Sequence, residues 1–271
     1  MCRHIAYLGP EIRLGQLLTE PPHSLVHQSW APQRQASGTV NADGFGVGWY
    51  APEDPVPARY RRAGPIWADL SFTDLARVVR SGAVLAAVRD ATLAGADAEA
   101  AAAPFASGRW LFSHNGAVAG WPDVAAPLLS ALPPVDLLAL EARSDSAFVW
   151  ALVLHRLRSG DGPGQALGET VRQLAGAAPA SRLNLLLTDG ETIAATRWGD
   201  SLWYRTEPGR STVCASEPYD DDPLWQEVPD RTVLTASRAG VLLAPLEDPA
   251  SSPALDSARA GGPPSSKEPC T

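Results

Sequence analysis

Two helical segments in the middle of the chain separate two blocks of short strands, and this order constrains the fold more than any other feature. In residues 144–158 and 165–177 apolar side chains recur at helical intervals, and Ser144 or Asp145 is suited to cap the first helix. The segments on either side of this pair have the composition of strands. Strands, then helices, then strands predict an α+β fold with layered packing rather than alternating βαβ units.

The block before the helices holds four segments typical of strands: residues 3–8, 44–50, 83–89 and 109–114. Three glycines within 44–50 indicate that another backbone or a ligand comes close to that strand. Residues 70–80 have helical spacing and predict a helix inside this block.

Two stretches of the first block are predicted to be loops. Residues 10–40 are polar and contain proline, and residues 94–107 form an alanine-rich insertion. We expect the insertion to lie on the surface.

The block after the helices opens with a hairpin. Residues 182–188 and 191–198 flank Asp189-Gly190, a turn sequence that favours positive φ. Further strands are expected at 201–205, 211–215, 231–236 and 239–244. Residues 247–271 are rich in Pro, Ser, Gly and Ala without periodicity, and they predict a disordered tail.

Charge and cysteine content exclude several classes of function. The net charge of −8 over 271 residues argues against nucleic acid as a partner. Apolar runs stay well short of the roughly 20 residues of a membrane span, which predicts no membrane partner. Cysteines at 2, 214 and 270 have neither a disulfide nor a metal spacing, and the cytoplasm is the expected compartment. Cys214 is expected in the core and Cys270 on the tail.

Cys2 is the first candidate catalytic residue. If Met1 is removed, Cys2 carries a thiol and a free α-amine on the same carbon. Because an α-amine has a pKa near 7.7 to 8.0, it can act as a base on the thiol at neutral pH. The alternative, which position alone favours, is that Cys2 packs as a small apolar side chain. His4, His114 and His155 each have a structural role available, so we predict no cysteine–histidine dyad.

Three further segments carry groups suited to substrate binding. Asn115 and Gly116, after His114, offer a side-chain amide and an N–H for an oxyanion, although Asn-Gly is also the commonest hairpin turn. Arg89 ends a predicted strand and suits a carboxylate, with a surface ion pair as the alternative. Asp145 suits either a substrate ammonium or the helix cap, and the sequence favours neither.

Five short segments in this order resemble the class II glutamine amidotransferases, a branch of the N-terminal nucleophile hydrolases. The segments are Cys2-Arg3-His4, N41-ADGFGVGWY50, Arg89 with Thr92, H114-NG116 and S144-DS146. The resemblance spans about residues 2–245 and makes residues 2–246 a class II glutaminase-like domain. It implies a four-layer αββα sandwich of the N-terminal nucleophile hydrolase type.

The resemblance also implies roles for the candidate residues, and it implies no cofactor and no metal. Cys2 would supply thiol and amine, and Asn115 and Gly116 would form the oxyanion hole. Arg89 and Thr92 would hold the α-carboxylate of a γ-glutamyl substrate, Asp145 its α-ammonium, and His114 would line the same site. Members of the family often carry Trp after the arginine and His after the threonine, whereas this chain has Asp90 and Leu93.

Within the family, residues 2–10, 41–50 and 214–230 are most similar to a stand-alone branch of ergothioneine biosynthesis. This implies hydrolysis of γ-glutamyl-hercynylcysteine S-oxide to glutamate and hercynylcysteine S-oxide, with water as the acceptor. The alternatives are a glutaminase subunit that delivers ammonia to a separate synthetase, and a catalytically silent γ-glutamyl-binding domain. The sequence leaves open whether the chain forms a homo-oligomer.

Aromatic residues crowd the second strand block beside an acidic run. They are Trp198, Trp203, Tyr204, Tyr219 and Trp225, next to Asp220, Asp221 and Asp222. Aromatic faces and carboxylates bind quaternary ammonium groups, so this region is a hypothetical site for the betaine of the leaving group. The alternative, which is favoured for any single residue, is packing between sheets with the acids on a solvated loop.

Overall fold

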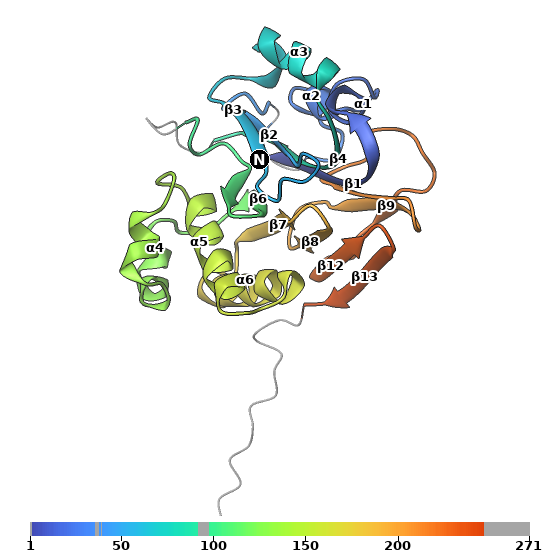
Figure 1. The fold of residues 1–271 in the computed structure, drawn as a ribbon. Coiled ribbons are helices and arrows are strands. Elements are labelled where there is room, and N and C mark those ends of the chain that lie inside the picture. Colours follow the sequence, from blue (N-terminus) through green and yellow to red (C-terminus); the bar gives the residue numbers. More distant parts are fainter. Residues whose placement is uncertain (1, 36–37, 39, 92–97, 247–271) are drawn as a thin grey trace, which may run out of the picture.

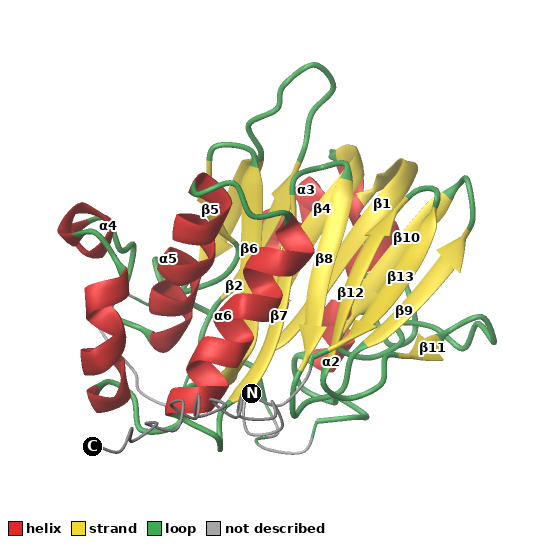
Figure 2. Cartoon of the chain, turned by 90° about the horizontal axis from the view of Figure 1, so that it is seen from below, coloured by secondary structure: helices red, strands yellow, loops and turns green. Residues whose placement is uncertain are grey.

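The computed structural model describes residues 2–35, 38, 40–91 and 98–246. Two antiparallel β-sheets lie face to face, and helices cover the outer side of each sheet (Figures 1 and 2). The fold is therefore the four-layer αββα sandwich that the sequence predicts. The expected tail, residues 247–271, and Cys270 within it lie outside the described residues.

The first sheet has seven strands, and the strand that follows Cys2 lies at its centre. Its strands are β1 (Arg3–Arg13), β2 (Phe45–Trp49), β3 (Ala58–Arg62), β4 (Arg80–Val88), β9 (Trp203–Glu207), β10 (Ser211–Ala215) and β11 (Gln226–Glu227). Their order in the sheet is β11-β9-β10-β1-β4-β2-β3. β1 therefore pairs with β10 on one side and with β4 on the other.

The second sheet has six strands and contains the predicted hairpin. Its strands are β5 (Phe105–Ser107), β6 (Trp110–Ala117), β7 (Arg182–Thr188), β8 (Thr192–Arg197), β12 (Thr232–Ser237) and β13 (Gly240–Pro245). Their order is β13-β12-β8-β7-β6-β5. The prediction of a β7–β8 hairpin around Asp189-Gly190 is confirmed.

Helices pack on the outer faces because most of them bury apolar side chains. On the first sheet lie α1 (Leu14–Leu18), α2 (Leu25–Gln28) and α3 (Leu70–Val78). On the second lie α5 (Asp145–Arg158) and α6 (Pro163–Ala177), with α4 (Pro134–Leu138) beside α5 and 3-10 helices at Ile66–Ala68 and Asp123–Ala131. Among the described residues, every helix is too short or too polar to cross a bilayer.

The core has three apolar layers, one between the two sheets and one under each set of helices. The central layer is made of small and aliphatic residues such as Ala6, Leu8, Leu85, Leu111 and Leu186. Because side chains alternate along a strand, each strand of β1, β4 and β6 contributes to two of these layers. This close stacking fixes how the ends of β1, β4 and β6 meet.

Both predicted loops of the first block are wrong in part. Residues 10–40 contain α1 and α2, whose runs of four or five residues are too short to show a helical period. In the insertion at 94–107, Ala101, Ala102 and Phe105 are buried rather than on the surface. A Cβ on Gly46 of β2 would collide with the carbonyl of Ala103. The glycines of β2 therefore let this alanine-rich segment pack against the strand, as their presence predicts.

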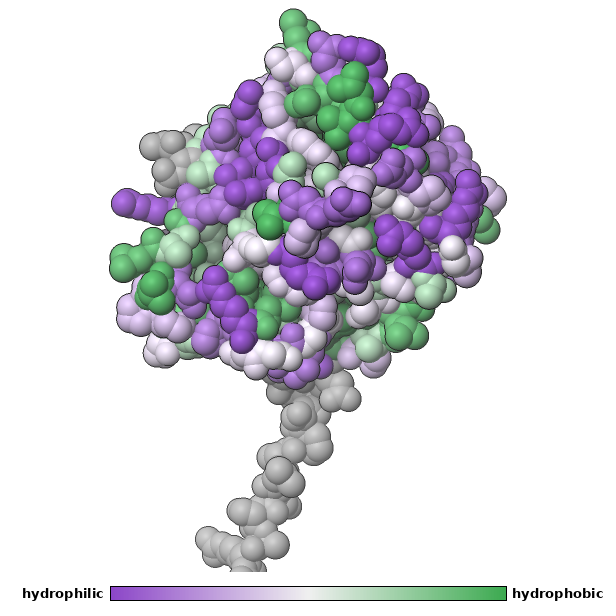
Figure 3. Space-filling model, in the orientation of Figure 1, coloured by the Kyte–Doolittle hydropathy of each residue, from purple (hydrophilic) through white to green (hydrophobic). Residues whose placement is uncertain are grey.

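The surface is mostly polar on the side shown in Figure 3, and two of its apolar patches lie over helices. One lies at the top of the view, over α3, and the other at the left, over α4 (Figures 1 and 3). The exposed apolar residues of these helices are Leu70, Val78, Val135 and Leu138. Neither place coincides with the candidate site, which lies where β1 begins.

Candidate active site

Three of the candidate residues, Cys2, Arg89 and His114, line one cavity, whereas Asn115, Gly116 and Asp145 do not line it. Antiparallel pairing brings the start of β1 to the end of β4. Arg3 is the register partner of Val88, so Cys2 lies beside Arg89. The C-terminal half of β6 and the N-terminus of α5 approach from the second sheet. One cavity results, and its lining residues are Cys2, Ala87, Val88, Arg89, Ala101, Ala103, Phe105, Ser113, His114 and Ser146.

The surroundings of the Cys2 thiol decide its protonation. Desolvation by the surrounding protein raises the pKa of this thiol, and the charge of Asp145 raises it further. A hydrogen bond from the backbone of Asp90 and the charge of Arg89 act in the opposite direction but are outweighed. The resting sulfur is therefore a thiol, and a base must remove its proton as it attacks a substrate.

Arg89 keeps its charge free for a ligand. Its Nη1 donates to the carbonyl of Asp43 at 3.2 Å, and the Asp43 carboxylate accepts the N–H of Ala91 at 2.8 Å. Within the described part of the chain no carboxylate lies within ion-pair distance of Arg89, so the surface ion pair considered above is not formed. Thr92, its expected companion, lies outside the described residues.

Asn115 and Gly116 lie inside strand β6, so the alternative of a hairpin turn is wrong. Asn115 pairs with Asn184 and Gly116 with Leu183 of β7. Gly116 has a φ of 153°, and a Cβ there would collide with the carbonyl of Arg182. Only glycine lets the two strands approach this closely. The Asn-Gly sequence by itself does not distinguish a hairpin turn from a strand, and the pairing with β7 shows that it is a strand here.

Asp145 does not cap α5, because Ser144 does. The Ser144 hydroxyl accepts the N–H of Ala147 at 3.2 Å. Asp145 is the first residue of the helix, and its two oxygens accept the N–H groups of Val118 at 3.0 Å and Ser146 at 2.7 Å. These bonds hold the carboxylate close enough to affect the Cys2 thiol. A role in binding an ammonium stays a prediction.

His114 links three elements around the cavity. Its Nε2 lies 3.0 Å from the carbonyl oxygen of Arg182, which can only accept, so Nε2 carries the proton. Its Nδ1 lies 3.1 Å from the Ser146 hydroxyl, which also lies 3.4 Å from Asp145 Oδ1. Both nitrogens are hydrogen-bonded, so neither is free to act as a base on Cys2. Contact between His114 and a substrate remains a prediction.

Sequence reasoning missed a buried ion pair behind Cys2. Arg3 is fully buried, its Nε donates to the carbonyl of Cys2 at 3.0 Å, and its Nη1 lies 3.9 Å from Glu217. Glu217 also accepts the N–H groups of Gln33 at 3.1 Å and Arg34 at 2.8 Å. A loop and the end of β10 thus hold the backbone of Cys2. Nothing in the sequence around Glu217 signals a partner more than 200 residues away.

His4 is held in the neutral form between the two sheets. Its Nδ1 lies 3.2 Å from the Ser113 hydroxyl, and burial, together with the charges of Arg3 and His114, lowers its pKa from 6.5 to about 3. Folding thus favours the neutral imidazole, so this stabilisation is complete above pH 6.5 and is lost as the pH falls from 6.5 toward 3.

We therefore expect acid to destabilise the protein through His4. Between pH 7 and pH 5, the free energy of unfolding should fall by about 2 kcal/mol more in the wild type than in His4→Gln. Urea unfolding at the two pH values measures this difference. Equal pH dependence in wild type and His4→Gln would contradict the assignment.

Arginines of the chain itself lie over four aromatic rings of the second strand block, and a cavity remains beside Trp203, Trp225 and the acidic run 220–222. Arg205 lies 5.1 Å from the ring of Tyr219 and 5.3 Å from that of Trp225. Its Nη1 also contacts Asp220 at 2.9 Å and Asp222 at 3.0 Å. Arg34 stacks on Trp203 and Arg231 on Trp198 in the same way. These contacts give the rings and acids a structural role, and the betaine site stays a hypothesis because the cavity lies beside them.

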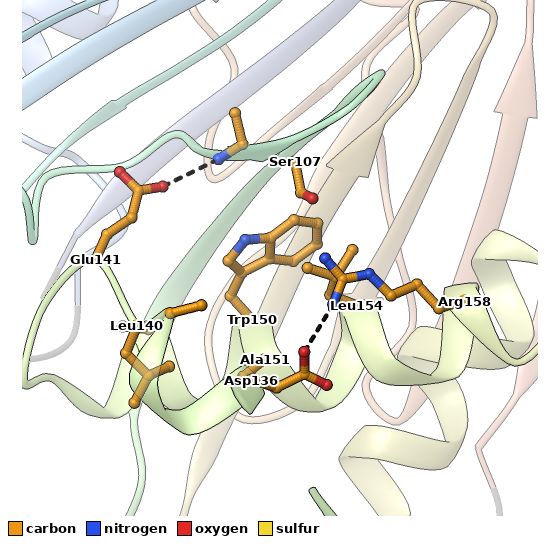
Figure 4. Close-up of a pocket in the computed structure, with 11 residues that line it drawn as sticks. Ser107, Asp136, Leu140, Glu141, Trp150, Ala151, Leu154 and Arg158 are labelled. Carbon is orange, nitrogen blue, oxygen red and sulfur yellow. Dashed lines mark hydrogen bonds and ion pairs between the residues drawn. The ribbon is translucent and has the colours of Figure 1, made fainter. Parts of the chain in front are cut away.

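A second pocket lies between β5, α4 and α5 (Figure 4), and its charged groups are paired with other groups of the protein. Trp150 forms its wall, and Asp136 binds Arg158 at 2.8 Å across it. Glu141 is held by Arg59 and by Arg61, at 3.1 and 2.8 Å. No charged side chain is left over for a ligand among the described residues that line this pocket, so it is not a candidate site.

Known proteins resemble this chain over most of its length. The sequence profile described as Glutamine amidotransferases class-II matches residues 19–208. The gamma-glutamyl-hercynylcysteine sulfoxide hydrolase of Mycolicibacterium smegmatis is 42% identical over 246 residues, 91% of this chain and 100% of that protein. The protein of the same description from Mycobacterium tuberculosis is 42% identical over 249 residues, 91% of this chain and 97% of its own.

A solved structure agrees with these sequence relationships. The glutamine aminotransferase class-II domain protein from Silicibacter pomeroyi superimposes with a TM-score of 0.66 at 26% identity. The alignment covers 91% of this chain and 100% of that protein. The similarity therefore extends over both sheets and is not confined to the segments around Cys2.

Proposed function

Since this chain belongs to the class II glutamine amidotransferases, we propose that it hydrolyses the γ-glutamyl amide bond of γ-glutamyl-hercynylcysteine S-oxide, releasing glutamate and hercynylcysteine S-oxide. The observation that carries this proposal is 42% identity, over the full length of the relative, to a gamma-glutamyl-hercynylcysteine sulfoxide hydrolase. The cavity shared by Cys2, Arg89 and His114 supports it. The substrate partner is thus a small γ-glutamyl compound.

In the proposed reaction, Cys2 is the nucleophile after Met1 has been removed. The α-amine of Cys2 accepts the thiol proton while the sulfur adds to the γ-carbonyl carbon. Burial of the thiol favours its neutral form, and the α-amine on the same carbon is suited to accept its proton. The C–N bond then breaks as the amine returns the proton to the leaving nitrogen. Water, activated by the same amine, cleaves the thioester and releases glutamate.

The glutamyl end would be recognised by charge at both of its ionised groups. Arg89, which has no carboxylate partner among the described residues, binds the α-carboxylate. Asp145 at the start of α5 binds the α-ammonium, and Thr92 adds a hydroxyl to the carboxylate site. Binding both groups fixes the γ-carbonyl against the Cys2 sulfur. Asn115 and Gly116 donate to the oxygen that becomes negative in the tetrahedral intermediate.

The proposed compartment is the cytoplasm. Cys2 and Cys214 are both free thiols, and a reducing compartment keeps thiols in that form. Burial raises the pKa of Cys214, which makes it an unreactive core residue, as its sequence context predicts.

A panel of γ-glutamyl donors tests the proposed function. We expect kcat/KM for γ-glutamyl-hercynylcysteine S-oxide to exceed that for glutamine at least about 100-fold, because a leaving group of that size adds contacts worth about 3 kcal/mol or more. Glutamate release measures all donors alike, and glutathione serves as a γ-glutamyl control of intermediate size. If glutamine is the best donor, the protein is a glutaminase that delivers ammonia, and this proposal is wrong. If the donors bind but none is hydrolysed, the protein is a silent binding domain.

A further inference from the structure

Ser216, directly after β10, lies against the amide of Asn115. It is fully buried, and its hydroxyl oxygen accepts the N–H of His4 at 3.0 Å. Its own N–H donates to the carbonyl of His4 at 2.9 Å, and the Ser201 hydroxyl donates to its carbonyl at 2.8 Å. These bonds tie Ser216 to β1, two residues after Cys2. Asn115 reaches across from the second sheet, with Nδ2 3.4 Å from the Ser216 hydroxyl.

In this arrangement two buried polar groups lack partners. With Nδ2 toward Ser216, the Asn115 Oδ1 has no hydrogen bond among the described residues. The Ser216 hydroxyl already accepts from His4, and none of the described residues accepts its proton. Unpaired buried acceptors are unfavourable. Because the two ends of an asparagine amide have nearly the same shape, its hydrogen-bond network decides which end faces which neighbour.

We propose that Ser216 is the positioning residue of the oxyanion hole: its hydroxyl donates to Asn115 Oδ1 and thereby turns Asn115 Nδ2 toward the γ-carbonyl oxygen of the substrate. This orientation pairs both groups that are otherwise left without partners. It also places a donor, not an acceptor, where negative charge develops. The inference rests on the proposed function, since it assigns Asn115 to the oxyanion of that reaction. Ser216 acts through Asn115 and touches no reacting atom.

The test compares Ser216→Ala with the wild type in kcat and in KM. A donor that is present but misoriented loses much of its effect, so we expect kcat to fall about 10- to 100-fold while KM changes less than twofold. Ser81→Ala is the matched control, because Ser81 is a buried serine bonded to backbone groups of β4 and residue 50. It should keep the wild-type kcat.

A second readout separates positioning from a loss of structure. The γ-nitrile analogue of glutamine accepts the Cys2 sulfur at its carbon and the thiol proton at its nitrogen, which then occupies the oxyanion hole. Its affinity should fall in Ser216→Ala by the same factor as kcat, whereas the affinity for glutamate stays within twofold. If Ser216→Ala does not fold, Ser216→Cys replaces it, because a thiol fills the site but donates weakly. The same selective loss is expected.

Two results would overturn the inference. One is a folded Ser216→Ala or Ser216→Cys protein with kcat within twofold of the wild type. The other is an equal loss of affinity for the nitrile and for glutamate, which would mean that Ser216 only supports the fold. Failure of the proposed function is distinguishable, because the nitrile measurement needs no turnover. If the wild type binds the nitrile through Cys2 but hydrolyses no γ-glutamyl donor, the proposed function is wrong. The effect of Ser216 on nitrile affinity can then still be measured.

Discussion

Replacing Cys2 by alanine is expected to lower kcat by at least about 10⁴-fold, the scale on which removal of a catalytic nucleophile acts in other hydrolases. The physical reason is that no other described residue that lines the cavity offers a thiol. Both nitrogens of His114 and the hydroxyls of Ser113 and Ser146 lie within hydrogen-bond distance of other groups of the protein. Glutamate release from γ-glutamyl-hercynylcysteine S-oxide measures the loss.

Cys214→Ala is the matched control for Cys2→Ala. Cys214 is the other free cysteine of the described residues; it lies in the central core with no exposed surface. Its replacement should keep kcat and cost only a modest amount of stability, because a small cavity is left in the core. Turnover by Cys2→Ala above 1% of the wild type would reject Cys2 as the nucleophile, whatever the control shows.

The α-amine of Cys2 can be tested separately, because this chain has few other amines. Lys267 is its only lysine, so Lys267→Arg leaves the N-terminus as the target of amine-directed acylation. Intact mass establishes that Met1 has been removed and that acylation is complete. The acylated protein should lose turnover, since an amide cannot accept the thiol proton. Full turnover after complete acylation would contradict the amine as base.

The second large effect is expected from Arg89. Arg89→Ala should lower kcat/KM by about 10²- to 10³-fold, because two charge-assisted hydrogen bonds to the α-carboxylate contribute about 3 to 4 kcal/mol together. Arg89→Lys should recover only part of the loss, since an ammonium cannot form the two-pronged contact. Steady-state kinetics with the same donor measure both variants.

A substrate without the α-carboxylate shows whether Arg89 acts by binding it. The 4-aminobutanoyl analogue should be a poor substrate of the wild type and no poorer for Arg89→Ala, as expected when enzyme and substrate changes remove one interaction. Arg77→Ala, on the exposed side of α3 and paired only locally with Asp74, is the control and should behave as wild type. A further large loss on the truncated substrate would mean that Arg89 mainly supports Asp43.

The sequence alone predicts much of the fold, because its signals are local. The helical spacing over 144–158 and 165–177 extends over several turns, so it predicts helices there. The ends of those helices are confirmed within two residues. The hairpin at Asp189-Gly190 is confirmed for the same reason, since its turn chemistry lies within two residues. The five short segments around Cys2 predict the αββα sandwich only through their resemblance to a family, and not through any spacing.

The parts that the sequence does not predict depend on contacts between distant segments. Asn-Gly is a turn motif by itself, and only pairing with β7 makes residues 115–116 part of a strand. The composition of the alanine-rich segment predicts a surface loop, but the segment packs against β2 because the glycines of that strand leave room for it. Aromatic rings and acids in the last strands do not reveal that Arg205 of β9 lies over Trp225 and pairs with Asp220.

For the candidate site, the sequence predicts which groups carry the chemistry, and the tertiary structure decides how they are held. Cys2, Arg89 and Asp145 are predicted from the resemblance to a family, which depends on short local segments. Their supports, Glu217 behind Arg3 and Ser216 behind Asn115, are more than 100 residues away along the chain. Such partners meet because strand order and register bring β1, β6 and β10 together. A local sequence pattern contains no information on that register, since hydrogen bonding between strands is set by long-range packing.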